Sequence, residues 1–157
     1  MEYKDQLTFQ FISEPMDVNF GGNVHGGAVM KWMDQTAYAC AVAWAQTYCV
    51  TVYVGGIKFY KPIKIGDLVK IDARILYTGG TSIHVGLDVF SKGMFHDDFH
   101  KTTHCIMVFV SVDSEGKSIP VKKWIPETEQ QKQLEQYAMK LMTLRKDIEQ
   151  EMMPYVK

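Results

Sequence analysis

The sequence carries almost no excess of charge of either sign. Its 157 residues include 17 lysines and arginines against 18 aspartates and glutamates, so the formal net charge is -1 at pH 7. A protein that binds the phosphates of a nucleic acid needs a basic surface. The composition therefore gives no reason to expect nucleic acid as a partner.

Cysteines are few, and long hydrophobic runs are missing. Cys40, Cys49 and Cys105 form no CxxC pair and lie in apolar segments, which favours reduced core thiols in a cytoplasmic protein. No uninterrupted apolar stretch is long enough to span a bilayer. The polar residues 1–6 also lack the apolar region of a secretory signal. We therefore expect a soluble, cytoplasmic protein.

Internal repeats and a second domain boundary are also absent from the sequence. Apolar residues make up 46% of the chain and charged residues 22%, as in ordinary globular proteins. A chain of this length has room for one sizeable core. We therefore predict a single domain that covers residues 1–157.

Two segments have the composition or periodicity of helices. Residues 26–46 contain few polar side chains, which predicts a helix that is apolar nearly all round and therefore buried. From Pro126 onward, apolar residues recur at spacings of three and four among glutamine, glutamate and lysine. This pattern predicts an amphipathic C-terminal helical extension at about residues 127–152.

Between these helices the sequence alternates as strands do. Alternating apolar and polar residues predict strands at 50–54, 69–77 and 83–89, and residues 7–12 read as a short edge strand. The continuous apolar run 105–112 predicts a strand that is covered on both faces. Gly55-Gly56 is predicted to be a bulge, after which the strand resumes at Ile57 and Phe59. The expected class is α+β, with four or five long antiparallel strands beside one central helix.

The segment Gly22-Asn23-Val24-His25-Gly26-Gly27 directly precedes the apolar helix. Glycines at a helix start expose backbone N–H groups at the positive end of the helix dipole, where an oxyanion can bind. Asp34 is the one carboxylate within the helix, and burial of a charge is costly. Together these features suggest a site that polarises a carbonyl and attacks it with a carboxylate or a water.

These residues and their order resemble the hotdog-fold acyl-CoA thioesterases, in particular the cytosolic acyl-CoA hydrolases. The similarity extends from about residue 17 to 149, and the matching segments are 22–27, 30–34, 50–52, 59–63, 66–67, Ser82, 109–112 and 125–129. It implies a hotdog fold, in which an antiparallel β-sheet wraps a long central helix. It also implies an acyl-CoA substrate, with coenzyme A as part of the substrate and no other cofactor. Members of the family form homodimers, some of which associate further into hexamers as trimers of dimers.

The resemblance implies that Asp34 and Asn23 are catalytic. Thioester hydrolysis passes through an oxyanion, which the N–H groups of Gly26 and Gly27 and the Asn23 amide can stabilise. Asp34 then acts as a general base or as a nucleophile, and the sequence leaves this choice open. His25 is a further candidate catalytic residue, or its ring orients the loop. The structural alternatives for Asp34 are a pairing with Lys31 and the capping of a neighbouring backbone.

Helix geometry adds an independent argument about assembly. Asp34 lies seven residues after Gly27, which is roughly 10 Å along a helix axis. One helix cannot easily bring both groups to one carbonyl carbon. We therefore predict that Asn23 and Gly27 act together with Asp34 of a dimer partner, at a two-fold interface.

A glycine-rich turn is the candidate for the nucleotide end of coenzyme A. In related enzymes the turn that matches Gly79-Gly80-Thr81-Ser82 contacts the nucleotide, which makes Gly80, Thr81 and Ser82 candidate binding residues. Lys61 is a candidate for the phosphates, as is Lys58. The alternatives are a plain hairpin turn and lysines that keep a strand edge soluble.

The spacing of three histidines suggests a metal site, but the strand expected in this region argues against one. His96, His100 and His104 recur every four residues beside Asp97 and Asp98, a spacing that would cluster them on a helix. Residues 101–112 read as a strand instead, where four residues span about 13 Å. We therefore predict no metal site.

Two other functions remain open at this point. A hotdog dehydratase or hydratase would use a catalytic histidine with an acid on the helix, roles that His25 and Asp34 would fill. A non-catalytic acyl-CoA sensor would keep the fold for ligand control. The HGG motif with a nearby asparagine favours the hydrolase, and the presence of both Asp34 and Asn23 argues against a sensor.

Overall fold

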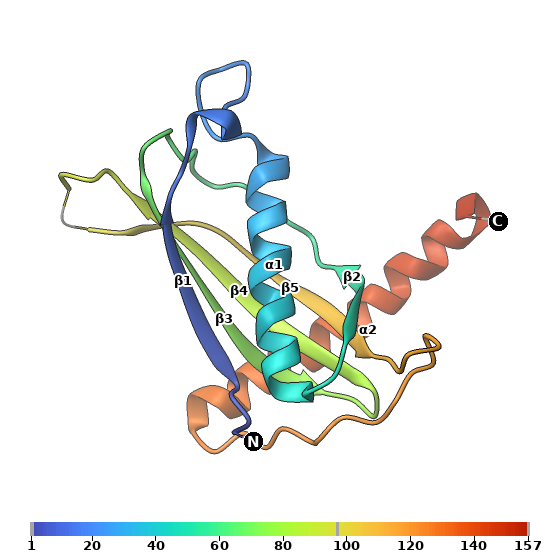
Figure 1. Ribbon diagram of the computed structural model, residues 1–157. Helices are drawn as coiled ribbons and strands as arrows, with labels where there is room; N and C mark the ends of the chain where they lie inside the picture. Colours follow the sequence, from blue (N-terminus) through green and yellow to red (C-terminus); the bar gives the residue numbers. More distant parts are fainter. Residues whose placement is uncertain (1, 97, 157) are drawn as a thin grey trace.

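The computed structural model describes residues 2–96 and 98–156. Within these residues the chain forms five strands and two long helices (Figure 1). The elements in chain order are β1 (Gln6–Ile12), the 3-10 turn η1 (Pro15–Asp17), α1 (Gly26–Ala45), β2 (Cys49–Val54), β3 (Leu68–Thr78), β4 (Ser82–Lys92), β5 (His100–Ser111) and α2 (Glu129–Val156). Neither long helix is sufficiently apolar to cross a membrane in the part of the chain described.

The strands form one antiparallel sheet in the order β1-β3-β4-β5-β2, so that β1 and β2 are its edges. Helix α1 lies along one face of the sheet, and α2 crosses the opposite face (Figure 1). Successive residues of a strand point to opposite faces. On β3, for example, Val69, Ile71 and Ala73 are buried beneath α1, while Lys70 and Asp72 lie between them on the outer face.

The main core lies between α1 and the sheet. One side of α1 is fully buried there, and Met33 and Phe109 are among the largest side chains that are closed off from solvent. Removal of a buried side chain of this kind from water contributes about 1.5–3 kcal/mol. The core residues of the helix are Ala28, Val29, Met33, Ala37, Cys40, Ala41 and Trp44.

A smaller core holds α2 on the outer face of the sheet. Leu76 of β3, Ile106 of β5 and Ala138 of α2 are buried together. Strand β5 is therefore covered on both faces, as the apolar run 105–112 predicted, although it begins earlier, at His100. The predicted C-terminal helix is confirmed, and it extends to Val156.

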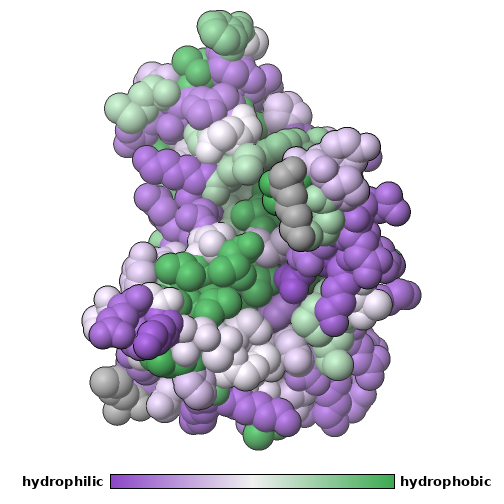
Figure 2. Space-filling model, turned by 90° about the vertical axis from the view of Figure 1, so that its right-hand side faces the viewer, coloured by the Kyte–Doolittle hydropathy of each residue, from purple (hydrophilic) through white to green (hydrophobic). Residues whose placement is uncertain are grey.

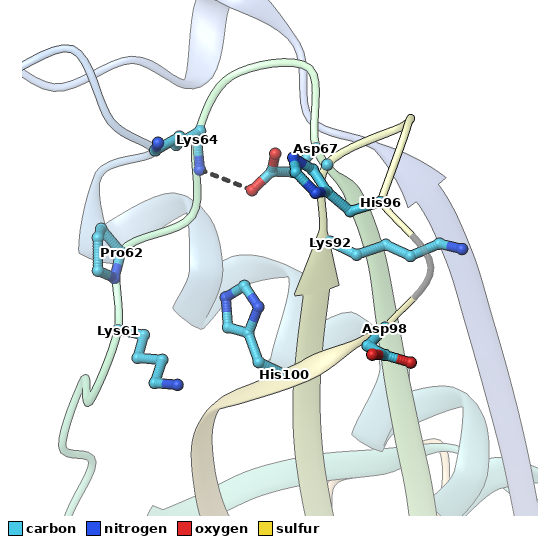
Figure 3. A pocket seen from close by; sticks show the side chains of 9 residues that line it. Lys61, Pro62, Lys64, Asp67, Lys92, His96, Asp98 and His100 are labelled. Atoms are coloured by element: carbon cyan, nitrogen blue, oxygen red, sulfur yellow. Dashed lines mark hydrogen bonds between the residues drawn. The ribbon is translucent and has the colours of Figure 1, made fainter.

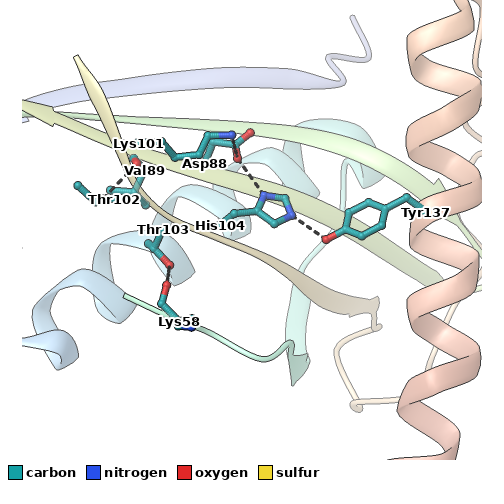
Figure 4. A network of polar contacts seen from close by, with 8 residues as sticks. All are labelled: Lys58, Asp88, Val89, Lys101, Thr102, Thr103, His104 and Tyr137. Carbon is teal, nitrogen blue, oxygen red and sulfur yellow. Dashed lines mark hydrogen bonds and ion pairs between the residues drawn. The ribbon is translucent and has the colours of Figure 1, made fainter. Parts of the chain in front are cut away.

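A polar network also ties α2 to the sheet (Figure 4). Oδ1 of Asp88 contacts His104 Nδ1 and Lys101 Nζ, each at 2.9 Å, and His104 Nε2 lies 2.9 Å from the Tyr137 hydroxyl. Burial raises the pKa of Asp88, but the hydrogen bonds from His104 and Lys101 outweigh it and leave the pKa below its usual value. A connected series of charge-assisted hydrogen bonds thus links β4, β5 and α2.

The expectation that α1 is buried all round is wrong for the single chain. Met30 and Tyr38 are 42% and 37% exposed, on the side of the helix that faces away from the sheet. The other residues on this side, spaced by three and four, include Gly27, Lys31 and Asp34. Composition predicted burial, but one sheet can cover only one side of a helix. The open side is available to a further protein surface.

The predicted bulge at Gly55-Gly56 is also wrong. The register shift of β2 against β5 lies between Thr51 and Tyr53, and the strand ends at Val54 without resuming at Ile57 and Phe59. Gly55 instead donates its N–H to the carbonyl of Ile106, and a Cβ on Gly55 would lie only 2.8 Å from that oxygen. The glycine therefore permits a close backbone approach at the point where the strand ends.

Candidate active site

The candidate site begins at the N-terminus of α1, where His25 is the N-cap. Its backbone is extended, with φ -75° and ψ 150°, and its Nδ1 accepts a hydrogen bond from the N–H of Ala28 at 3.0 Å. The ring thus satisfies one of the free donors of the first turn. This geometry matches the loop-orienting alternative for His25, and its predicted catalytic role stays a prediction.

The two glycines after the cap leave the helix start open. The N–H groups of Gly26 and Gly27 have no hydrogen-bond acceptor among the described residues. A Cβ on Gly27 would lie 3.1 Å from His25 Nδ1, so any side chain there would crowd the capping ring. A Cβ on Gly26 would lie 3.3 Å from the ring of Phe59. The helix start therefore presents free donors at its positive end, in a place where a side chain would make tight contacts with His25 and Phe59.

A pocket of about 320 Å³ lies against this helix start. The loop that forms one wall is held by two backbone bonds, from Val24 to the carbonyl of Ile63 and from His25 to the carbonyl of Asp17. The lining is mainly apolar, with few polar groups, as is typical of sites for small molecules. The lining residues are Asn19, Val24, Gly26, Val29, Phe59, Tyr60, Lys61, Pro62, Ile63 and Thr102.

The pocket is lined by Asn19, which sequence reasoning missed, rather than by Asn23. Oδ1 of Asn19 accepts the N–H groups of Gly21 and Asn23, at 2.8 and 3.0 Å. Both contacts use the amide oxygen, so the NH₂ group of Asn19 remains available as a donor. Backbone hydrogen bonds hold Asn23 in the loop, and its backbone also forms an isolated β-bridge with Lys64. The only sequence signal for Asn19 was its place in the loop before the glycine motif.

Asp34 lies on the open side of α1, next to the edge strand β2. It is half-buried, and its Oδ1 accepts a hydrogen bond from the Thr51 hydroxyl at 2.8 Å. Sequence reasoning favoured Thr51 as a residue that fills the core rather than one that contacts the acyl chain, but Thr51 is exposed in the structure. Its hydroxyl fixes the carboxylate in one orientation. One structural alternative, an ion pair with Lys31, is not among the salt bridges of the described residues.

Gly27 and Asp34 both lie on the open side of α1, but at different positions along the helix axis. The seven residues between them correspond to about 10 Å of helix rise. The pocket at the helix start and the Asp34 carboxylate therefore lie at separate places on one chain. Asp34 is absent from the lining of the pocket, as the two-chain hypothesis requires.

A second, more polar pocket of about 590 Å³ adjoins the first (Figure 3). The two pockets share Lys61 and Pro62. Lys61 and His100 extend toward the middle of the second pocket, whereas Lys92 points away from it (Figure 3). Lys61, which was predicted to bind coenzyme A, thus lies where the apolar pocket opens into a polar one.

The turn that contains Gly80, Thr81 and Ser82 lies at the other end of the molecule. The Thr81 carbonyl accepts the N–H of Ser111, at the end of β5. The N–H of the next residue, Val112, donates to the carbonyl of Tyr48, which lies just after the end of α1. The Gly80 carbonyl accepts from Val121. The 20 residues of α1, about 30 Å, therefore separate this turn from Gly27 within one chain.

Two of the three histidines, His96 and His100, line the second pocket, whereas His104 lies apart from them. His100 and His104 both lie on β5, and His104 is engaged with Asp88 and Tyr137. Residues 2–96 and 98–156 contain no group of three or more side chains that would hold a metal ion. Asp97, which completed the predicted pattern, lies outside the described residues.

The three cysteines are buried free thiols, as the sequence predicted. Burial raises the pKa of Cys40 and of Cys105 to about 12 and that of Cys49 to about 11, and the charges of Asp5 and Asp88 contribute at Cys40 and Cys105. Thiols with such pKa values stay protonated at neutral pH, so they do not act as nucleophiles.

Comparison with known proteins identifies the family. The profile of the thioesterase superfamily matches residues 21–94, which include the helix start, Asp34 and Thr51. The acyl-CoA thioester hydrolase YciA of Salmonella typhimurium is 32% identical over 119 residues, which cover 74% of this chain and 90% of that protein. The chain belongs to the thioesterase superfamily. Protein VdlD of Helicobacter pylori is also 32% identical, over 80% of this chain and 72% of its own length.

Solved structures agree with this family. The acyl-CoA hydrolase of Staphylococcus aureus, solved with butyryl coenzyme A and coenzyme A, is 26% identical and superposes with a TM-score of 0.88 over 96% of this chain and 92% of its own. A hexameric acyl-CoA thioesterase, solved without ligand, is 28% identical with a TM-score of 0.86, over 90% and 91% of the two chains. The predicted α+β hotdog fold is thereby confirmed.

Proposed function

We propose that this thioesterase-superfamily member hydrolyses acyl-CoA to a free carboxylic acid and coenzyme A. The observation that carries the proposal is the open start of α1. Two backbone N–H groups without acceptors point from the positive end of a 20-residue helix, beside a pocket with one unused amide donor. Such an arrangement stabilises the oxyanion of a thioester under attack.

Asp34 is the proposed source of the attack. As a general base its carboxylate takes a proton from water, which adds to the carbonyl carbon; as a nucleophile it forms a mixed anhydride that water then cleaves. In both routes the oxyanion collapses and expels the coenzyme A thiolate. The Thr51 hydroxyl holds the carboxylate in position at 2.8 Å. Our sequence-based candidates Asn23, Gly27 and His25 stay in the proposal, with His25 as the cap of the helix.

Asn19 is added to the proposal by its position and by a relative. The Staphylococcus aureus hydrolase has been solved as variants in which an asparagine, an aspartate or a threonine is replaced by alanine. In that chain the asparagine precedes the aspartate by 15 residues, and the threonine follows it by 17. Asn19 precedes Asp34 by 15 residues here, and Thr51 follows it by 17. This spacing supports Asn19, Asp34 and Thr51 as the matching set.

The proposed enzyme acts as a homodimer with two equivalent sites. The half-site at Gly27 and the half-site at Asp34 face the same way from α1 but lie about 10 Å apart, so two antiparallel copies of α1 would complete each other. Solved relatives described as hexameric include the Yersinia pestis thioesterase y2039, which supports homo-oligomers here. Gly80, Thr81 and Ser82 of the same chain lie about 30 Å from the helix start. Coenzyme A bound near Lys61 would therefore contact this turn only on another chain. The cytoplasmic location and the absence of a further cofactor stay predictions.

The test is the release of free thiol from a panel of short to long acyl-CoAs. Asp34→Asn is nearly isosteric, so it should keep the fold and the assembly while removing most turnover. Asn19→Ala should lower kcat by about 100- to 1,000-fold, as loss of an oxyanion donor does. Asn23→Ala decides between the two candidate asparagines, because Asn23 lies outside the pocket lining and should matter less than Asn19 if the pocket binds the thioester.

The outcomes separate the alternatives. Thiol release that depends on Asp34 supports the hydrolase, and the panel then gives its chain-length preference. Wild-type rates in Asp34→Asn would refute the mechanism. If no acyl-CoA releases thiol, hydration of an enoyl-CoA identifies a dehydratase or hydratase, and thermal stabilisation by acyl-CoA without turnover identifies a sensor.

A further inference from the structure

A cavity of about 180 Å³ lies between α2 and the outer face of the sheet, on the side opposite α1. Ile106 and Val108 of β5 line it from the sheet, and Leu141, Leu144 and Ile148 line it from the helix. None of the described residues that line this cavity also lines either pocket near the start of α1. The cavity is therefore separate from the candidate active site.

The cavity is buried at its base and open at its rim. Ile106 and Val108 are buried, whereas Leu144 and Ile148 are 48% and 53% exposed. Gly56 also lines the cavity, and a Cβ there would meet nothing within 4 Å, so this residue leaves its side of the cavity open. Figure 2 views the molecule from the side of β2 and the end of α2, and apolar side chains gather around a hollow on this face. A small molecule thus has a path from solvent into the cavity.

Arg145 of α2 brings a positive charge into this apolar lining. Its Nε is shielded from solvent and makes no hydrogen bond within the described residues. A carboxylate oxygen of Glu149 lies 3.4 Å from Nε, but the two do not have the geometry of a hydrogen bond, and the Glu149 side chain is 57% exposed. The guanidinium itself is held over the ring of Tyr53, 4.7 Å from its centroid. Because a buried donor without an acceptor is costly, this position favours a ligand that supplies an acceptor.

His84 of β4 is the second polar group in the lining. Only 3% of it is exposed, and among the described residues its ring nitrogens contact only the Ser82 hydroxyl, from Nε2 at 3.5 Å. Burial, together with the smaller effect of the Arg145 charge, lowers the pKa of His84 to about 4, so the ring is neutral at pH 7 and carries one N–H. Tyr53, Val108 and His84 are in register across β2, β5 and β4. Arg145, above Tyr53, and His84 therefore lie on two sides of Val108, at the base of the cavity.

We propose that this cavity binds a short-chain carboxylate, with the carboxylate group between Arg145 and His84 and the alkyl chain among the apolar residues of α2 and β5. A guanidinium presents N–H groups in a fork that matches the two oxygens of a carboxylate. Apolar cavities of about 150 Å³ in other proteins hold benzene, so about 180 Å³ has room for a chain of about six carbons. One permanent positive charge in an apolar lining suits a monoanion with an alkyl chain, whereas a multiply charged phosphate would stay unpaired. The proposed hydrolysis releases acids of this class, but binding at this site does not depend on it.

Calorimetric titration with hexanoate tests the site, and hexanol provides the same chain without the charge. Hexanoate should bind with a dissociation constant of roughly 1 mM or below, and hexanol at least about tenfold more weakly. Arg145→Met removes the charge but keeps an unbranched apolar chain, so it should weaken hexanoate binding at least about tenfold. Lys146→Met is the matched control, because Lys146 is the next residue of the helix, is exposed and lies outside the cavity lining. It removes the same charge and should bind hexanoate as the wild type does.

Leu144→Trp is the second variant, for the case in which Arg145→Met does not fold. It places a larger side chain at the exposed rim, so it should also weaken hexanoate binding at least about tenfold. Hexanoate should shift the NMR resonances of the His84 ring in the wild type. Wild-type affinity in either variant that folds would overturn the proposal, because hexanoate would then bind elsewhere, and so would equal affinities for hexanoate and hexanol or no binding at all.

The two proposals fail separately. A protein that binds hexanoate through Arg145 but releases no thiol from any acyl-CoA would refute the proposed function and not this site. A thioesterase that fails to bind hexanoate here would refute this site and not the proposed function.

Discussion

Buried His84 makes the stability of the protein depend on pH. Only 3% of His84 is exposed, beneath α2, and its ring packs edge-on against Tyr77 at 5.0 Å between centroids. Burial, together with the smaller effect of the positive charge of Arg145, lowers the pKa of His84 from 6.5 to about 4. The folded chain therefore holds His84 neutral at a pH where the unfolded chain protonates it.

The sign and size of the effect follow from proton linkage. Between pH 6.5 and 4 the unfolded state binds more protons, so acid destabilises the fold. The stabilisation is fully present above pH 6.5 and is lost as the pH falls toward 4. A difference of about 2.5 pH units corresponds to about 3 kcal/mol at most, and most of this is lost by pH 4.5.

Urea unfolding of the wild type and of His84→Gln, at pH 7 and pH 4.5 and at one protein concentration, measures this loss. Glutamine keeps a polar group without a charge to bury. The unfolding free energy of His84→Gln should therefore fall by roughly 2–3 kcal/mol less than that of the wild type. Carboxylates that titrate in this range act on both proteins and cancel in the difference. Equal losses in the two proteins would refute the reasoning, as would an NMR titration that places the His84 pKa near 6.5.

Three further substitutions test separate contacts. Thr51→Val should lower kcat/KM by about 10- to 100-fold, because the Asp34 carboxylate loses a hydrogen bond, and Thr51→Ser should restore most of it; equal rates in both would remove Thr51 from the site. Gly55→Ala should destabilise the fold by about 1–3 kcal/mol in urea unfolding, because its Cβ meets the Ile106 carbonyl, while Gly56→Ala should change little. Tyr137→Phe should lower the unfolding free energy by about 1 kcal/mol through the lost contact with His104, with exposed Tyr155→Phe as its control; no difference between the two would mean that the network does not hold α2.

The site combines parts that differ in how visible they are from sequence. The capped, glycine-rich start of α1 was visible, because only glycine leaves room beside the His25 ring and such motifs are short and local. Asp34 was visible because a carboxylate is out of place in an apolar helix. Asn19 and Thr51 were not, because a loop asparagine and a strand threonine are common, and their importance depends on what the fold places next to them.

The sequence by itself determined the order and type of the elements. These signals depend on neighbours within a few residues: alternation and one continuous apolar run identified the strands, apolar composition identified α1, and spacings of three and four identified α2. The tertiary structure decided what depends on distant residues: the end of β2, the open side of α1, and the 30 Å between the Gly80 turn and Gly27. Apolar composition predicts that a surface will be covered. Only the arrangement of the sheet determines which side of α1 and which half of α2 stay exposed in the single chain.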